Sequence, residues 1–274
     1  MHGLTITPRL MCFMIVLLPM IVMQDLTAED ESPTRGTPRK ELKLPGLVIN
    51  FEKRFVDVAS VVCLTEGTLE LIACTKGTKE HESIIAIEAK AMHVHTGLLL
   101  LGSRPGHPAI RRRVDSEGGG WIDLPPRGDP VDVYLVVPTS DDTAVEYPIS
   151  DFVEPNSDLD LPGGTGPGTD GDGVSTKPAN KLPHSFLFAG SVLVEQEDGP
   201  RRYLSDANGN VISIATFGDE LLCLPELHSQ ENRSLLWRVN DTHLPTVGTK
   251  VTLRLRPRPS QTDSDQSDDP DVQD

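Results

Sequence analysis

The sequence predicts an α+β domain that is rich in β-structure, with a mainly antiparallel sheet and one principal helix. Two observations lead to this prediction. Short apolar stretches alternate with polar residues and are separated by tight-turn signals, and one segment alone has the composition of a good helix. Strands joined by short turns are typical of antiparallel sheets, so a single inserted helix gives an α+β domain rather than an α/β one.

Strand patterns begin near residue 42 and continue to residue 257. LKLPGLVINFEKRFVDV contains two short strands that meet at residues 52–54, and VVCLTEGTLELIAC predicts a hairpin with Glu66 and Gly67 at its tip. VDVYLVVP is a strand with TAVEYPISDFV as its expected neighbour. Further strands are expected in SIIAIEA, SFLFAGSVLVEQEDGPRRYLSD, DANGNVISIAT, LLWRV and VTLRLR.

The principal helix is expected at about residues 89–102, AKAMHVHTGLLLLG. This segment has strong helix formers and a leucine run, and Gly102 is a typical C-terminal stop. Met92, His95, Leu99 and Gly102 recur at spacings of three and four, which predicts that they share one face of the helix.

Residues 1–28 are expected to be a secretory signal peptide. Arg9 precedes an apolar run from Leu10 to Met23, and the small residue Ala28 comes just before an acidic stretch. The run is shorter than the roughly 20 apolar residues of a membrane-spanning helix. We therefore expect an exported protein, located in the periplasm, the cell envelope or outside the cell. An uncleaved N-terminus is the alternative, and it is the one expected route to a membrane.

The remaining chain divides by composition. Residues 29–41 form a polar leader, and residues 42–257 are expected to form a single domain. Within it, residues 156–181 are glycine, proline, aspartate and threonine with almost no apolar side chain. Such a segment cannot bury enough surface to offset chain entropy, which predicts a flexible insertion. Residues 258–274 are expected to be a disordered acidic tail.

The net charge of −16 is concentrated in two segments. Residues 151–176 and 260–274 each carry six acidic residues and no basic one, which leaves about −4 for the rest of the chain. This balance argues against a nucleic-acid partner. The arginines at 254, 256 and 258 alternate along VTLRLRPRP, which indicates the solvent face of a strand.

Cleavage after Ala28 would leave three cysteines, Cys63, Cys74 and Cys223. In the expected hairpin, Cys63 and Cys74 lie about four strand residues apart, roughly 13 Å. A disulfide needs Cα atoms within about 7 Å, so none is expected between them. Buried, inert thiols are the default expectation.

The most concentrated polar motif is GTKEHES, residues 77–83, which adjoins an apolar run. In an extended strand, Lys79, His81 and Ser83 would share one face and the two glutamates the other. One interpretation is functional, with His81 as a proton carrier or ligand beside a glutamate. The other is structural: a tight turn whose carboxylates satisfy backbone N–H groups, while Lys79 pairs with Glu66 or Glu70. The candidate patch comprises Cys74, Lys79, Glu80, His81, Glu82, Ser83 and His95.

The histidine spacing does not favour a metal site. His93 and His95 are two apart on the expected helix, about 200° around its axis, so they cannot easily share one ion. A zinc site of His81, Glu82 and His95 remains chemically feasible, although no HExxH spacing exists. A buried His95 that donates to a backbone carbonyl is favoured, and neither a metal nor another cofactor is expected.

EGTLELIACTKGTKEHESII, HTGLLLLGSRPGHPA, FLFAGS, YLSD and VGTKVTLRL occur in this order. This succession resembles the YdjY-domain family of exported bacterial proteins over about residues 42–257, with residues 66–108 the most specific part. The resemblance implies the fold and export but assigns no activity, and residues 156–181 resemble a lengthened form of a connection that is shorter in relatives. It implies motif positions at Glu66, Gly67, Cys74, Gly77, Thr78, Lys79, Glu80, His81, Glu82, Ser83, His95, Gly102 and Gly106.

These observations favour an exported module that binds a small ligand or an envelope protein through a polar patch at residues 77–83. The alternative is an extracytoplasmic hydrolase, either metal-dependent or assisted by His and Ser, that uses His81, His95 and a nearby glutamate. A third hypothesis is a structural component of an envelope assembly, kept soluble by its acidic tail.

Overall fold

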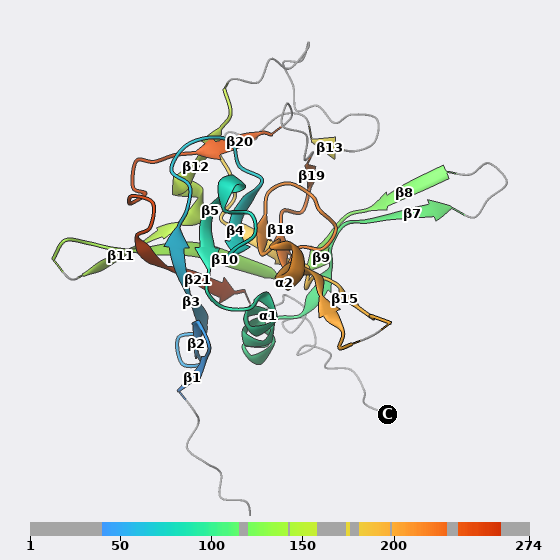
Figure 1. Ribbon diagram of the computed structural model, residues 1–274, viewed down its shortest axis with the longest axis horizontal. Helices are drawn as coiled ribbons and strands as arrows, with labels where there is room; N and C mark the ends of the chain where they lie inside the picture. Colours follow the sequence, from blue (N-terminus) through green and yellow to red (C-terminus); the bar gives the residue numbers. More distant parts are fainter. Residues whose placement is uncertain are drawn as a thin grey trace, which may run out of the picture. The chain divides into compact units, whose positions relative to one another are not determined.

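The computed structural model describes residues 40–114, 120–141, 143–157, 174–175, 181–197, 199–228 and 235–258. The described chain is rich in β-structure and has few helices (Figure 1). Its helical segments are η1 (Glu80–Glu82), α1 (Ala91–Leu100), η2 (Ile149–Phe152) and α2 (Leu204–Asn208). Its longer strands are β1 (Glu41–Leu44), β2 (Leu47–Asn50), β3 (Phe55–Val62), β4 (Leu71–Thr75), β5 (Ser83–Ile87), β7 (Ile110–Val114), β8 (Gly120–Leu124), β10 (Pro130–Pro138), β11 (Ala144–Pro148), β14 (Ser185–Phe188) and β21 (Lys250–Pro257). The short strands are β6 (Pro105–His107), β9 (Arg127–Gly128), β12 (Val153–Pro155), β13 (Val174–Ser175), β15 (Leu193–Val194), β16 (Arg202–Tyr203), β17 (Ile212–Ser213), β18 (Leu222–Cys223), β19 (Leu227–His228) and β20 (Trp237–Val239).

The main sheet closes into a barrel of eight strands in the order β3–β21–β10–β14–β18–β17–β4–β5. The first half of β3 pairs with β2, and its second half pairs with β5, which returns the sheet to its starting strand. Most pairings are antiparallel, but β4–β5 and β17–β18 are parallel. β11 adds to β10 outside the closed ring.

Side-chain alternation along the strands fills the barrel. In β10, Val131, Val133 and Leu135 are fully buried, while the residues between them are partly exposed. β21 shows the same period of two, as expected for strands with one face on a core. Every residue of β4 and β5 is buried, which explains their continuous apolar sequences.

Several expected pairings are confirmed. β2 and β3 form a hairpin around residues 51–54, and β10 pairs with β11. The hairpin expected at residues 56–74 is wrong: β3 and β4 do not pair with each other, because β5 lies between them and pairs with both. β5, which comes later in the chain, therefore occupies the position beside β3 that the turn signal predicts for β4.

The helix prediction holds in place and type, but its face differs from the expectation. The core side of α1 is formed by Ala91, Val94 and Leu98, whereas Leu99 is 45% exposed. The helix approaches the sheet closely at Gly97, where a Cβ would lie 3.1 Å from Val56 Cγ2. Gly102 follows the helix with a φ of +85°, the left-handed geometry that ends helices.

The expected signal peptide, residues 259–274 of the expected tail, and residues 158–173 and 176–180 of the insertion lie outside the described residues, as does the leader up to residue 39. Within the insertion, β13 pairs in parallel with β19. The first described strand is β1, which starts close to the expected boundary at residue 42. Among the residues that the structure describes, no helix has the length and hydropathy needed to cross a membrane.

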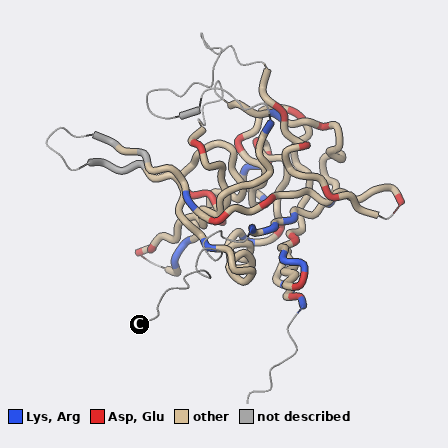
Figure 2. The backbone as a smooth tube through the Cα atoms, turned by 180° about the vertical axis from the view of Figure 1, so that it is seen from behind, with Lys and Arg blue, Asp and Glu red and all other residues tan. Residues whose placement is uncertain are grey.

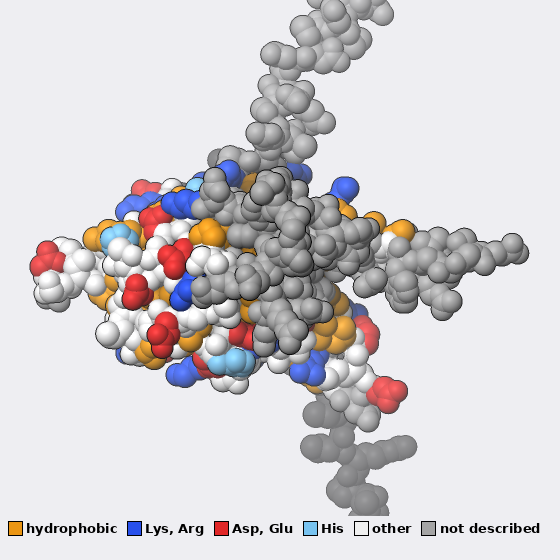
Figure 3. Space-filling view, turned by 90° about the horizontal axis from the view of Figure 1, so that it is seen from above, with side chains coloured by type: hydrophobic (Ala, Val, Ile, Leu, Met, Phe, Trp, Pro, Cys, Tyr) orange, Lys and Arg blue, Asp and Glu red, His pale blue; other side chains and the backbone are white. Residues whose placement is uncertain are grey.

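An ionic network covers part of the outer face of the barrel. Arg254 binds Asp57 with two hydrogen bonds of 2.6 and 2.7 Å and binds Glu146 at 2.6 Å. Its guanidinium also lies 4.1 Å from the centre of the Phe55 ring. Arg256 binds the same Glu146 at 2.7 Å. Acidic and basic residues are intermixed along the described chain, and side chains of both signs are interspersed on the face in Figure 3 (Figures 2 and 3).

Candidate functional site

The GTKEHES motif lies in the connection between the parallel neighbours β4 and β5, formed by residues 76–82. Parallel neighbours usually need a connection of a dozen or more residues. Here seven residues suffice, because Gly77 adopts a φ of +82° and η1 forms a tight helical turn just before β5. We call this segment the crossover.

Polar side chains of the crossover satisfy its own backbone. The Gly77 N–H donates to Glu80 Oε1 at 2.5 Å, and the Thr78 hydroxyl donates to the Thr75 carbonyl at 2.5 Å. The Ser83 hydroxyl donates to the Lys79 carbonyl at 2.7 Å. The expected extended alternation over residues 79–83 is therefore wrong, because residues 80–82 turn instead of extending.

The charged residues of the motif cluster near Glu70, the residue just before β4. Lys79 Nζ lies 3.2 Å from Glu82 Oε1 and 3.7 Å from the centre of the Phe217 ring. Glu70, which is 9% exposed, interacts with both Lys79 and Glu82. Burial, followed by the nearby Glu82 charge, raises the pKa of Glu70. His81 is 78% exposed, with Nε2 3.6 Å from Glu82 Oε2.

The raised pKa of Glu70 predicts a specific dependence of stability on pH. At low pH, Glu70 is protonated in both the folded and the unfolded chain. As the pH rises above the ordinary value of 4.5, the unfolded chain ionises first, so the free energy of unfolding falls. We expect Glu70→Gln to leave stability unchanged near pH 4 and to increase it progressively toward pH 7, measured by urea unfolding across this range.

Glu66→Gln is the matched control, because Glu66 is an exposed carboxylate close by in the sequence. Its unfolding curves should run parallel to those of the wild type at every pH. A Glu70→Gln profile that also runs parallel to the wild type would contradict a raised pKa of Glu70 in the folded protein.

Two thiols lie against the crossover. The Cys63 thiol donates to the Ser83 carbonyl at 3.1 Å and interacts with the thiol of Cys74. The hydrogen bond with Cys63, together with the nearby Ser83 and Thr78 hydroxyls, lowers the pKa of Cys74 to about 7 despite burial. The same hydrogen bond and burial raise the pKa of Cys63. The hairpin from which a separation of roughly 13 Å was expected does not form, because β5 lies between β3 and β4. Cys63, Cys74 and Cys223 are free thiols.

His95 belongs to a different environment. Its Nδ1 lies 2.9 Å from the Tyr203 hydroxyl, which itself donates to the Gly190 carbonyl at 2.9 Å. The ring also packs edge-on against Phe188 at 4.9 Å, and burial lowers the pKa of His95. The pKa of His95 is also influenced, in the opposite direction, by a hydrogen bond with the Gly190 backbone. Within the described ranges, no three or more His, Cys, Asp or Glu side chains are grouped to hold a metal, so His81, Glu82 and His95 do not form a zinc site.

The DANGN segment supports both α1 and the crossover, which sequence reasoning missed. Asp206 accepts the N–H of Ala91 at the first turn of α1, at 2.5 Å. Gly209 ends α2 with a φ of +86°, and a Cβ there would lie 2.2 Å from Thr78 Oγ1. Asn208 and Asn210 each donate to the buried carboxylate of Asp219 at 2.5 Å. The Asn-Gly signal indicated a turn, but it could not show what packs against that turn.

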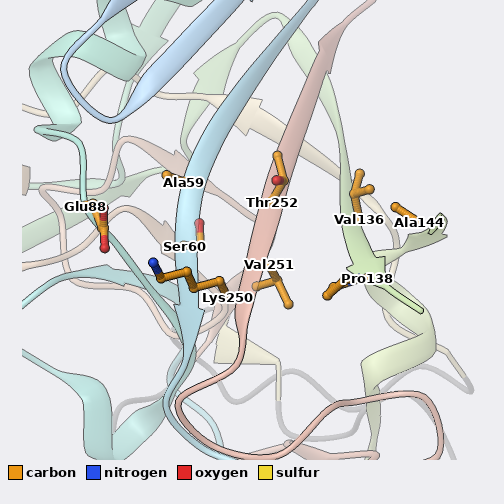
Figure 4. Close-up of a pocket in the computed structure, with 9 residues that line it drawn as sticks. All are labelled: Ala59, Ser60, Glu88, Val136, Pro138, Ala144, Lys250, Val251 and Thr252. Carbon is orange, nitrogen blue, oxygen red and sulfur yellow. The ribbon is translucent and has the colours of Figure 1, made fainter. Parts of the chain in front are cut away.

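A groove of about 350 Å³ opens on the outer face of β3, β21 and β10 (Figure 4). It lies where short side chains follow long ones along the strands. Thr252 is paired with Ala59 and Val136, whereas Arg254, two residues further along the same face, is paired with Asp57. The residues that line the groove are Ala59, Ser60, Glu88, Val136, Pro138, Ala144, Lys250, Val251 and Thr252.

Charges of opposite sign lie at one side of this groove. Figure 4 shows the Lys250 side chain extending toward Glu88, which follows β5. The sequence holds a weak signal for the groove: in the outward series Lys250, Thr252, Arg254 and Arg256, the threonine is the one short member. This signal alone does not predict a groove, because the groove also depends on Ala59 and Val136, which lie beside Thr252 on the two neighbouring strands.

A closed, mainly antiparallel barrel with a tight parallel crossover thus defines a β-rich domain that carries an open groove. The chain belongs to the YdjY-domain family, whose family model matches residues 47–256. The match covers the barrel strands from β2 to β21 almost completely. No curated protein and no solved structure shows detectable similarity to the chain.

Proposed function

We propose that this protein is an exported binding domain and that its groove receives a short segment of a protein partner in the cell envelope. The observation that carries the proposal is the groove itself. Its volume of about 350 Å³ lies at the lower end of the range for binding sites. It is open along the sheet rather than enclosed, which suits a side chain presented by another protein better than a small molecule that must be largely buried.

The groove offers an apolar floor with charged margins. Ala59, Val136 and Val251 supply aliphatic surface, and Glu88 and Lys250 supply one charge of each sign. Such a surface favours an apolar side chain flanked by charged residues.

In this proposal the crossover is a structural support for the neighbouring strands. Its carboxylate and hydroxyl groups bind its own backbone, and Lys79 is held by Glu82 and Phe217. Among the crossover residues that the structure places in an ionic contact, His81 has the most exposed side chain. Export rests on the apolar run and Ala28 in the N-terminal sequence, and N-terminal sequencing of the exported protein should find Glu29 first.

The groove is tested by selecting peptides from a random displayed library against the purified protein. We expect enriched peptides to carry an apolar residue flanked by charges. Thr252→Arg, which places a long side chain in the middle of the groove, should weaken their binding by roughly tenfold or more. Lys250→Glu should weaken binding of peptides that carry an acidic residue near the apolar one.

Lys43→Glu is the matched control, since Lys43 is an exposed lysine on β1 and does not line the groove. It makes the same change of charge as Lys250→Glu and should leave peptide affinity unchanged. Selected peptides that bind Thr252→Arg as tightly as the wild type would refute the groove as the binding site.

A further inference from the structure

Three segments meet at one end of the described domain, where β1 starts and α1 ends. The Phe51 N–H donates to the Lys40 carbonyl at 2.9 Å, which joins the turn between β2 and β3 to the residue before β1. The Arg54 guanidinium donates to the Leu101 carbonyl at 2.8 Å, which joins the same turn to the end of α1. β1, β2 and α1 lie together at the lower end of Figure 1. We call residues 40, 51–54 and 99–101 the β1–α1 end.

Arg54 holds this end in a defined geometry. Its φ is +53°, which is uncommon for a residue other than glycine. The guanidinium lies at the C-terminal end of α1, where a helix carries partial negative charge. Arg54 is exposed, and a guanidinium has five N–H donors. It can therefore bind the Leu101 carbonyl and an anion from outside at the same time.

Two neighbouring leucines are exposed beside Arg54. Leu99 and Leu100 lie in the last turn of α1 and are 45% and 47% exposed, whereas Leu98 and Leu101 on either side of them are buried. Single exposed apolar residues are normal at a protein surface. The other large exposed apolar residues in the described ranges stand singly in the sequence: Ile110, Ile122, Val145, Leu193 and Val247. The adjacent pair therefore indicates a contact surface.

The charge around the β1–α1 end is opposite in sign to the charge of the whole chain. The chain carries a net charge of −16, but residues 40–54 have four basic and two acidic side chains. Residues 89–104, which contain α1, have two basic side chains and no acidic one. Lys53 is exposed, and no carboxylate in the described part of the chain forms an ion pair with it. An anionic surface would thus attract this end of the protein and repel the rest.

We propose that the β1–α1 end binds the surface of a membrane that contains anionic phospholipids. Leu99 and Leu100 would enter the boundary between headgroups and acyl chains, and Lys53 and Arg54 would lie against the phosphates. Burial of apolar side chains and attraction of basic ones are the two contributions that hold proteins at a membrane surface. Binding is expected to be reversible, because two leucines bury less apolar area than an acyl anchor.

Membrane contact at this end leaves the groove open to a partner. Ala59 and Ser60, which line the groove, lie in the second half of β3. The turn at residues 51–54 lies before the first residue of that strand. The inference therefore goes beyond the proposed binding of a peptide segment and does not depend on it.

The test is cosedimentation of the purified exported protein with vesicles of phosphatidylglycerol and phosphatidylcholine in equal parts. We expect binding at low salt, loss of most binding in high salt because surface charges are then screened, and little binding to phosphatidylcholine alone. Leu99→Gln combined with Leu100→Gln keeps helix-forming residues and should weaken binding by roughly tenfold or more. Lys53→Glu should also weaken it by roughly tenfold or more, at about fivefold for each unit of charge.

Val247→Gln and Lys76→Glu are the matched controls. Val247 is 59% exposed, and the next residue, Gly248, donates to the Val62 carbonyl at the far end of β3. Lys76 is an exposed lysine just after β4. Both variants should bind the vesicles as the wild type does. Circular dichroism melting checks that every variant is folded, which the exposure of the changed side chains favours.

The proposal is overturned if the wild type does not bind the anionic vesicles or binds phosphatidylcholine vesicles equally well. It is also overturned if the folded double leucine variant binds as the wild type does. A dimer seen by light scattering, dissociated by the leucine changes and without vesicle binding, would assign the surface to a second copy of the chain instead. Peptide binding at the groove is measured without vesicles, so either proposal can fail alone.

Discussion

Replacement of Gly128 by alanine is expected to destabilise the protein by at least about 3 kcal/mol. Gly128 ends β9 and has a φ of +152°, a conformation that side chains rarely adopt. An added Cβ would lie 2.0 Å from the Phe188 carbonyl oxygen and 2.5 Å from its carbon. The clash is with the backbone of β14, a barrel strand, so a side-chain rotation cannot relieve it. Urea unfolding followed by circular dichroism measures the loss.

Gly67→Ala separates steric clash from backbone strain. Gly67 also has a positive φ, +104°, but a Cβ there would meet nothing within 4 Å. It should therefore show strain alone, about 1–2 kcal/mol. Equal losses in the two variants would show that the approach of Gly128 to Phe188 contributes nothing beyond the dihedral strain.

Removal of the Arg254 guanidinium should produce the second large effect. Arg254→Met keeps much of the aliphatic stem but removes both hydrogen bonds that Arg254 makes to Asp57 and leaves Glu146 with Arg256 alone. The side chains of Asp57 and Glu146 are 23% and 28% exposed. Truncation of one partner in a largely desolvated charge pair costs about 2–5 kcal/mol, and we expect the lower end here because some solvent reaches the network. The midpoint of urea unfolding is the measurement.

Arg258→Met is the comparison on the same face of the chain. Arg258 pairs with Asp132 at 2.8 Å; the Arg258 side chain is 48% exposed and the Asp132 side chain is 15% exposed. Because Arg258 is largely solvated and Asp132 Oδ1 also lies 3.8 Å from His184 Nε2, removal of Arg258 should cost about 1 kcal/mol or less. If Arg254→Met costs no more than Arg258→Met, then the network is not held by desolvated charge, and the stacking on Phe55 adds no measurable stability.

Sequence reasoning succeeded where an element and its partner are local. VDVYLVVP and TAVEYP alternate clearly and are separated by a short polar segment, and they form the β10–β11 ladder. The helix was signalled by its composition and by Gly102, which indeed ends it. The helix face was misjudged because spacings of three and four fit several faces of a leucine-rich segment. Contact with Val56 and Ile49 across Gly97 places α1 on the sheet.

Prediction from the sequence fails where a strand pairs with a segment that is distant in the sequence. Glu66 and Gly67 are typical residues of a tight turn. β3 nevertheless pairs with β5 and β21, and these pairings bury it in the barrel. The separation of Cys63 and Cys74 expected from this hairpin therefore loses its basis. The sequence correctly indicates that the crossover concentrates polar and charged side chains. Its internal hydrogen bonds depend on the tight turn at residues 80–82, and no periodicity in seven residues predicts such a turn.

The position of β21 has a consequence for synthesis. Residues 250–257 occupy the place between β3 and β10, so the ring of strands has a gap until nearly the whole chain exists. A growing chain that lacks this piece leaves the hydrogen-bonding edges of both neighbours unsatisfied and cannot settle into its final form.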